Sequence, residues 1–81
     1  MKLPRNLSGA QLIKALEKLE YQPTRQIGSH VRLTTPPSKE HHLTIPLHDP
    51  LRIGTLAAIL ADVAAHHSMT REALIIRLFG K

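Results

Sequence analysis

The sequence predicts an α+β domain in which two helices cover one face of a three-stranded antiparallel sheet, with a short C-terminal helix added. Two observations predict it: apolar residues recur at helical spacing near both ends of the chain, and they alternate with polar residues in the middle. The length of 81 residues fits one domain spanning 1–81. The expected order is therefore α-β-β-β-α, followed by the short helix.

The first helix is predicted to begin after Ser8, a good N-cap, with Gln11 three residues later completing a capping box. Its apolar stripe consists of Leu12, Ala15, Leu16 and Leu19. Proline lacks a backbone N–H and cannot continue a helix. Because Pro23 follows, we expect the helix to end near Glu20.

Three strands are predicted in the middle of the chain, at residues 21–26, 30–34 and 42–46. Pro23 places the first of them at the edge of the sheet. Strict alternation in the other two predicts one buried and one outer face. The buried face should hold Val31, Leu33, Leu43 and Ile45, and the outer face His30, Arg32, Thr34, His42 and Thr44. Polar and basic groups should therefore gather on one surface of the sheet.

Two further helices are predicted after the strands. The apolar residues of the longer one are Leu51, Ile53, Leu56, Ile59, Leu60 and Val63, which places its start between residues 52 and 55. It should fray around His66 and His67, whose imidazoles would interact favourably with the helix dipole at a C-terminus. The last helix should begin at a Thr70 or Ser68 cap, and its apolar side consists of Leu74, Ile75, Leu78 and Phe79.

Composition points to an anionic partner, because 11 Lys and Arg against 6 Asp and Glu give a net charge of +5. The absence of cysteine excludes disulfides, thiolate zinc sites and a cysteine nucleophile. An aromatic content of 2% argues against a base-stacking platform. No apolar stretch approaches the ~20 residues of a membrane span, and the N-terminus has no signal-peptide run. We therefore expect a cytoplasmic protein without a membrane partner.

The segment from Arg25 to Arg32 has the parts of an RNA-cleaving site. RNA supplies its own nucleophile, the 2′-hydroxyl, so one imidazole near neutral pH and nearby cations are enough for its chemistry. His30 would act as the general base, Arg25 and Arg32 would bind phosphate, and the N–H groups around Gly28-Ser29 would hold a phosphate oxygen. Arg25 reaches His30 only if strand pairing brings it there. The alternative is a simple turn followed by an exposed strand histidine.

The other histidines of the middle region do not form a metal site by spacing. His41 and His42 are adjacent in a strand, so they point to opposite faces and cannot chelate together. His42 and His48 would instead assist His30 as a second acid or as a phosphate contact, or they are a solvated strand residue and a loop residue. After His48, a helix start at Gly54-Thr55 would attract phosphate, or it is a tight connection in which Thr55 serves the helix start.

Taken together and in order, these residues resemble the HicA family, the small bacterial toxins of HicA–HicB toxin–antitoxin pairs. The matching residues are Leu3-Pro4-Arg5, Ser8-Gly9, Tyr21, Arg25, Gly28-Ser29-His30, Ile45-Pro46, His48, Gly54-Thr55-Leu56 and Ile59-Leu60. Each piece is weak alone, whereas the ordered set at this length is fairly specific. Residues 70–81 run past the minimal pattern of the family.

The resemblance implies a fold like that of double-stranded-RNA-binding domains and the activity of an mRNA interferase. It implies no cofactor, and a HicB-like antitoxin that neutralises the toxin by covering its active face. The family's catalytic histidine falls on His30, and its proline–x–histidine falls on Pro46 and His48. DNA binding is expected of the antitoxin and not of this chain. Two other interpretations stay open: a non-catalytic module for double-stranded RNA, and a subunit whose basic face docks an acidic protein.

Overall fold

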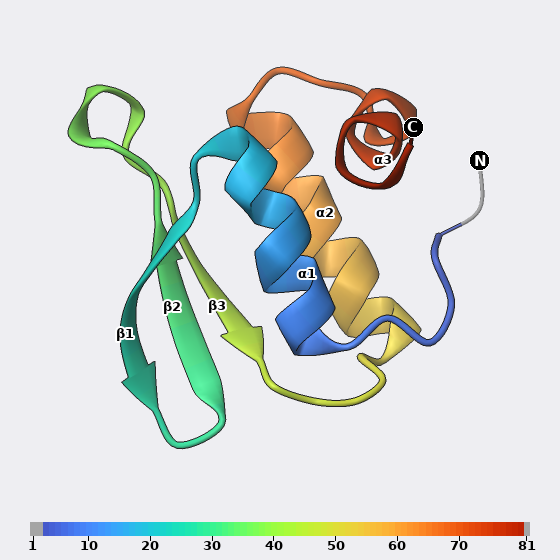
Figure 1. The fold of residues 1–81 in the computed structure, drawn as a ribbon. Helices are drawn as coiled ribbons and strands as arrows, with labels where there is room; N and C mark the ends of the chain where they lie inside the picture. The colour runs from blue at the N-terminus through green and yellow to red at the C-terminus, as the bar shows by residue number, and fades with distance from the viewer. Residues whose placement is uncertain (1–2, 81) are drawn as a thin grey trace.

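The computed structural model describes residues 3–80 and has the predicted order of elements. These are α1 (Gly9–Leu16), β1 (Gln22–Ile27), β2 (His30–Thr34), β3 (His42–Pro46), α2 (Ile53–His66) and α3 (Arg71–Phe79). Helices α1 and α2 lie side by side over one face of the sheet, and α3 packs beside them (Figure 1). The expected α-β-β-β-α architecture is confirmed, including the short helix at the C-terminal end.

The start of α1 follows from its local sequence. The Ser8 hydroxyl accepts from the Gln11 N–H at 3.1 Å, while the Gln11 side chain accepts from the Ser8 N–H at 2.9 Å. This capping box satisfies donors that a helix start leaves free. A 3-10 turn, Glu17–Leu19, extends α1, and Glu20 in the left-handed region ends it, as predicted.

Gly9 allows α1 to lie against the chain that leaves β3. A Cβ atom at this position would overlap the carbonyl oxygen of Pro46 and come within 3.1 Å of the Leu47 Cα. The Gly9 N–H donates to the His48 carbonyl oxygen at 2.9 Å. The first residue of α1 is thereby tied to the segment that follows the last strand.

The sheet has the order β1-β2-β3, and both pairs are antiparallel. Strand β1 is at the edge, as Pro23 predicted, and begins at Gln22, one residue later than predicted, since the Tyr21 N–H donates to the Leu16 carbonyl oxygen and not to the sheet. The alternation is confirmed, since Val31, Leu33, Leu43 and Ile45 are all buried while the outer face is open. Every residue of β1 is exposed, because the helices lie over the part of the sheet nearest β3 and leave the β1 edge uncovered (Figure 1).

The helices close the core from the other side. The fully buried residues of α1, α2 and α3 are Leu12, Leu16, Leu56, Leu60, Val63, Leu74 and Leu78. Thr70 is the cap of α3, accepting from the Ala73 N–H at 3.1 Å, which decides between the two predicted caps. The placement of Ile53 in the apolar set was wrong: it begins α2 at 53% exposure, while Leu51 is buried ahead of the helix.

No helix within residues 3–80 is long and apolar enough to cross a membrane.

Candidate active site

The β1–β2 hairpin places His30 at the start of β2. Gly28 adopts φ +57°, a conformation that glycine reaches at no steric cost, and this lets two residues connect the strands. His30 lies between Ile27 of β1 and Pro46 of β3 in the register of the sheet. The Ser29 carbonyl oxygen accepts from the Leu47 N–H at 2.7 Å, so the turn is also held by the chain leaving β3. Ser29, the residue before His30, is therefore held both by the β1–β2 turn and by the chain that leaves β3.

Strand pairing brings Arg25 opposite Arg32, which the sequence alone left open. The register of the hairpin is regular from this pair to the turn and shifts between Arg25 and Pro23, where β1 bulges. The bulge residue Thr24 bonds the Thr34 hydroxyl at 3.0 Å. Both arginines and His30 thus share the outer face of the sheet.

These three side chains line one hollow of about 160 Å³. Its lining consists of Arg25, Ile27, His30, Arg32 and Thr44, all of which are exposed. The hollow is on the side of the sheet that the helices leave open. A ligand in it would meet one imidazole, two guanidinium groups, one hydroxyl and the apolar Ile27 side chain.

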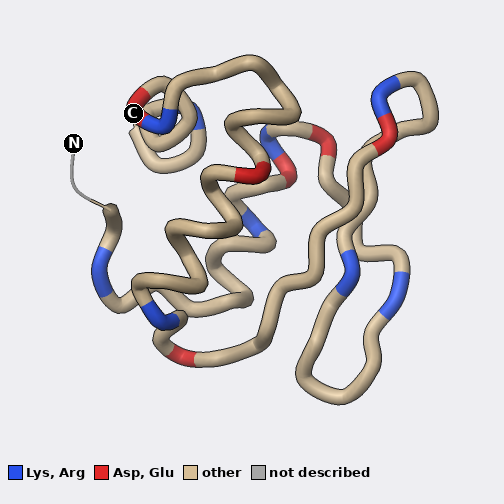
Figure 2. The backbone as a smooth tube through the Cα atoms, turned by 180° about the vertical axis from the view of Figure 1, so that it is seen from behind, with Lys and Arg blue, Asp and Glu red and all other residues tan. Residues whose placement is uncertain are grey.

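The charge around the hollow is of one sign. Between residues 22 and 34, the only charged side chains are Arg25 and Arg32. Figure 2 shows these two basic positions facing each other across neighbouring strands, with the acidic residues of the chain elsewhere. Paired guanidinium groups suit phosphate oxygens, since each presents several N–H donors in a planar fork.

His42 belongs to the same face but not to the hollow. Its Nδ1 lies 3.0 Å from the Thr34 hydroxyl and its Nε2 lies 3.2 Å from a Glu40 carboxylate oxygen. In the ladder, His42 pairs with Thr34 while His30 pairs with Pro46, an offset of four residues. At roughly 3.3 Å per residue this is about 13 Å along the strands, too far for His42 to share a proton with His30.

His48 and the start of α2 do not line the hollow. His48 is exposed, two residues beyond the pairing partner of His30, and does not line the hollow. Its role as an RNA contact stays a prediction, as does phosphate binding by the N–H groups of Gly28 and Ser29. Helix α2 begins at Ile53 with Arg52 as N-cap and no side-chain cap bond, so Thr55 does not cap it.

A second polar cluster, which the sequence analysis missed, lies at the other end of the strands. It joins Tyr21, His41, His66 and His67. Burial, followed by the nearby Asp62 carboxylate, raises the pKa of Tyr21 to about 12. Burial, followed by the charges of the neighbouring His66, His41 and Lys39, lowers the pKa of His67 below its ordinary 6.5. The only signal of this cluster in the sequence was the adjacent pair His66-His67, which the sequence analysis interpreted as a favourable placement at a helix C-terminus.

No grouping of three His, Asp or Glu side chains suited to a metal ion occurs within residues 3–80.

Comparison with known proteins shows the family to which the chain belongs. A family model described as the HicA toxin of bacterial toxin-antitoxin matches residues 9–64, more than half of the chain. No curated protein and no solved structure matches the chain. The matched range contains the hairpin, the hollow and α2 as far as Ala64, and leaves out Leu3-Pro4-Arg5 and α3. The chain therefore belongs to the HicA family, the toxins of bacterial toxin–antitoxin systems that act with a cognate antitoxin partner.

Proposed function

We propose that this toxin is a cytoplasmic endoribonuclease that cleaves mRNA, with His30 as the general base. One observation carries the proposal: His30, Arg25 and Arg32 line the same exposed hollow on the open face of the sheet. An imidazole beside two cations is the set of groups that cleavage of RNA by its own 2′-hydroxyl requires. Membership of the HicA family supports the same activity.

The chemistry proceeds in one displacement at phosphorus. An imidazole nitrogen of His30 takes the proton of the ribose 2′-hydroxyl, and the 2′-oxygen attacks the adjacent phosphorus. The bond from phosphorus to the 5′-oxygen breaks, and that oxygen takes a proton from water. The products are a 2′,3′-cyclic phosphate and a free 5′-hydroxyl, after which His30 returns its proton to solvent.

The arginines act on the phosphate rather than on the proton. Arg25 and Arg32 face each other across two strands, so a phosphate in the hollow meets both guanidinium groups. Charge that builds on the phosphate oxygens during attack is stabilised by donors already in place. We assign His48, Gly28 and Ser29 to RNA contacts at the rim, because Gly28 and Ser29 form the turn directly before His30 and His48 follows its pairing partner Pro46 by two residues.

Cleavage by the purified toxin, free of antitoxin, tests the proposal. We expect single-stranded RNA to be cut in EDTA, and RNA with a 2′-deoxy residue at the cut site to resist. Removal of a general base costs about 10²- to 10⁴-fold in rate, so His30→Gln should lose that much. His42→Gln is the matched control, since His42 is on the same face about 13 Å from His30 along the strands.

Two results would overturn the proposal. Intact RNA after incubation with the wild-type protein across pH 6–8 contradicts cleavage. Tight, salt-dependent binding of double-stranded RNA that His30→Gln leaves unchanged would favour the non-catalytic module instead.

In cells, expression of the chain without antitoxin should stop growth, and His30→Gln should relieve the arrest. We expect the HicB-like antitoxin to cover this face, with DNA binding left to the antitoxin.

A further inference from the structure

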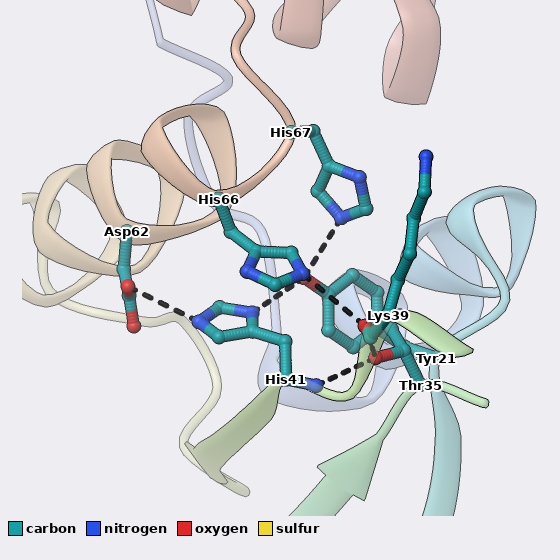
Figure 3. A network of polar contacts seen from close by, with 7 residues as sticks. All are labelled: Tyr21, Thr35, Lys39, His41, Asp62, His66 and His67. Carbon is teal, nitrogen blue, oxygen red and sulfur yellow. Dashed lines mark hydrogen bonds and ion pairs between the residues drawn. The ribbon is translucent and has the colours of Figure 1, made fainter. Parts of the chain in front are cut away.

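Four aromatic rings meet at the end of the sheet away from His30, outside the proposed RNA site (Figure 3). Tyr21 precedes β1, His41 precedes β3, and His66 and His67 end α2. The Tyr21 hydroxyl lies 2.7 Å from the His41 Nδ1 and 3.0 Å from the His67 Nε2. Three segments far apart in the sequence are joined through one buried phenol.

The protons of this network have one consistent arrangement when the imidazoles are neutral. The His41 Nε2 lies 3.2 Å from an Asp62 carboxylate oxygen, which only accepts, so this nitrogen carries the proton. The His41 Nδ1 is then an acceptor and takes the Tyr21 O–H. The Tyr21 oxygen in turn accepts from the His67 Nε2–H. A further proton on His41 would place a donor at Nδ1 against the Tyr21 O–H and break this order.

Stacking makes a second positive charge unfavourable. The rings of His41 and His66 are parallel within 7° and their centroids are 4.2 Å apart, while His67 is 4.9 Å from His66. Asp62 faces His41 from α2 and can balance one proton. The other charged groups here are Lys39, a cation, and Glu40, which bonds to His42. A second imidazolium would therefore lie beside the first with no further negative charge to balance it.

The cluster holds the β2–β3 connection on the end of α2. The His66 Nε2 donates to the Lys39 carbonyl oxygen at 3.2 Å, and the Thr35 hydroxyl donates to the same oxygen at 2.7 Å. The His41 N–H donates to the Thr35 hydroxyl at 2.7 Å. Residues 35–41 are thus attached to α2 largely through imidazoles, and histidine is the side-chain type whose charge ordinarily changes near neutral pH.

We propose that these residues form a proton-operated latch, in which neutral His41, His66 and His67 hold the β2–β3 connection against α2 and a second proton releases it. The release leaves the His30 hollow in place, because that end of the sheet is held by Gly9, Leu47 and Ser29. The latch is independent of RNA cleavage.

The sign of the pH dependence follows from His67. Its pKa is lowered in the folded protein, so the unfolded chain binds more protons as pH falls through 6.5. Stability is full above 6.5, falls below it, and levels off beneath the folded-state pKa. Where the unfolded chain holds one extra proton, the folding equilibrium constant drops about tenfold per pH unit.

Hydrogen exchange of the full chain by NMR tests the latch at pH 8.0 and 5.5. The reporters are two amides, the Thr35 N–H bonded to the His41 carbonyl oxygen and the His41 N–H bonded to Thr35. Corrected for intrinsic exchange, we expect their protection to fall several-fold, and at most about tenfold, at pH 5.5 relative to that of the Leu47 N–H, because pH 5.5 is one unit below the ordinary pKa of 6.5. His66→Gln keeps an amide donor for the Lys39 carbonyl oxygen and should flatten this response. His48→Gln, which is outside the cluster, should leave it unchanged.

Exchange in the wild-type protein alone provides a test that does not depend on the folding of any variant. We expect the Thr35 and His41 amides to lose protection together between pH 8.0 and 5.5, because one release event exposes both. Unchanged protection of both amides over this range would overturn the latch. An equal loss of protection in the wild type and in His66→Gln would overturn it as well.

Discussion

Replacing Gly9 by alanine should destabilise the protein, although alanine is the better helix former. Inside a helix, alanine exceeds glycine by about 1 kcal/mol, which is the largest gain the substitution can bring. Against it stands the backbone of Pro46, whose carbonyl oxygen the new Cβ would overlap and whose carbonyl carbon it would approach to 3.0 Å. Backbone cannot rotate away as a side chain can, so α1 and the segment after β3 must move apart.

The cost has two parts. Overpacking against a rigid neighbour costs about 1–3 kcal/mol. Loss of the Gly9 N–H bond to the His48 carbonyl oxygen, now 2.9 Å long, costs about 1 kcal/mol. After subtraction of the helix gain, we expect a net loss of about 2 kcal/mol. For a domain of this size that corresponds to a melting temperature lower by about 10 °C.

Gly54 is the matched control, because it is also in the first turn of a helix and a Cβ there would meet no atom within 4 Å. Gly54→Ala should raise the melting temperature by a few degrees. Thermal and urea unfolding, followed by circular dichroism, measure both variants. If Gly9→Ala were as stable as the wild type, the contact between α1 and the exit of β3 would be refuted. Equal gains in both variants would refute it most clearly.

Two further predictions concern the last helix and the basic hairpin. Thr70→Ala removes the acceptor of the Ala73 N–H and should cost about 1 kcal/mol in urea unfolding, whereas an unchanged midpoint would contradict the cap. Arg32→Gln should weaken RNA binding and reduce the slope of log K against log salt by about 0.7, the value for one phosphate contact on a single strand. A slope equal to that of the wild type would place Arg32 outside the RNA site.

Local patterns predicted the elements well where one principle decided them. The alternation from His30 to Thr34 predicted both the bounds of β2 and its two faces, because a two-residue period leaves no other arrangement. The Ser8 capping box likewise predicted the start of α1. Ile53 was misplaced because helical spacing alone cannot tell the first turn, which extends past the core, from the turns that pack on it.

The candidate site was predicted only in part for the same reason. His30 and Arg32 are two residues apart on one strand, so their common face follows from the sequence. Arg25 reaches them across a two-residue turn, and the register of β1 on β2 determines its position. The bulge before Arg25 follows Pro23, which lacks a ladder N–H, but proline is equally typical of a regular edge strand and so does not fix the register.

The sequence by itself determined the order of the elements, the basic charge and the exclusion of cysteine chemistry, and it is the source of the proposal that His30 is the general base. Each depends on residue type or on short spacing, which a linear pattern records. Only the tertiary structure decided that Arg25 meets Arg32, that His42 is remote from His30, and that Tyr21, His41, His66 and His67 form one cluster. These are contacts between segments up to 46 residues apart, and the packing of helices on the sheet creates them.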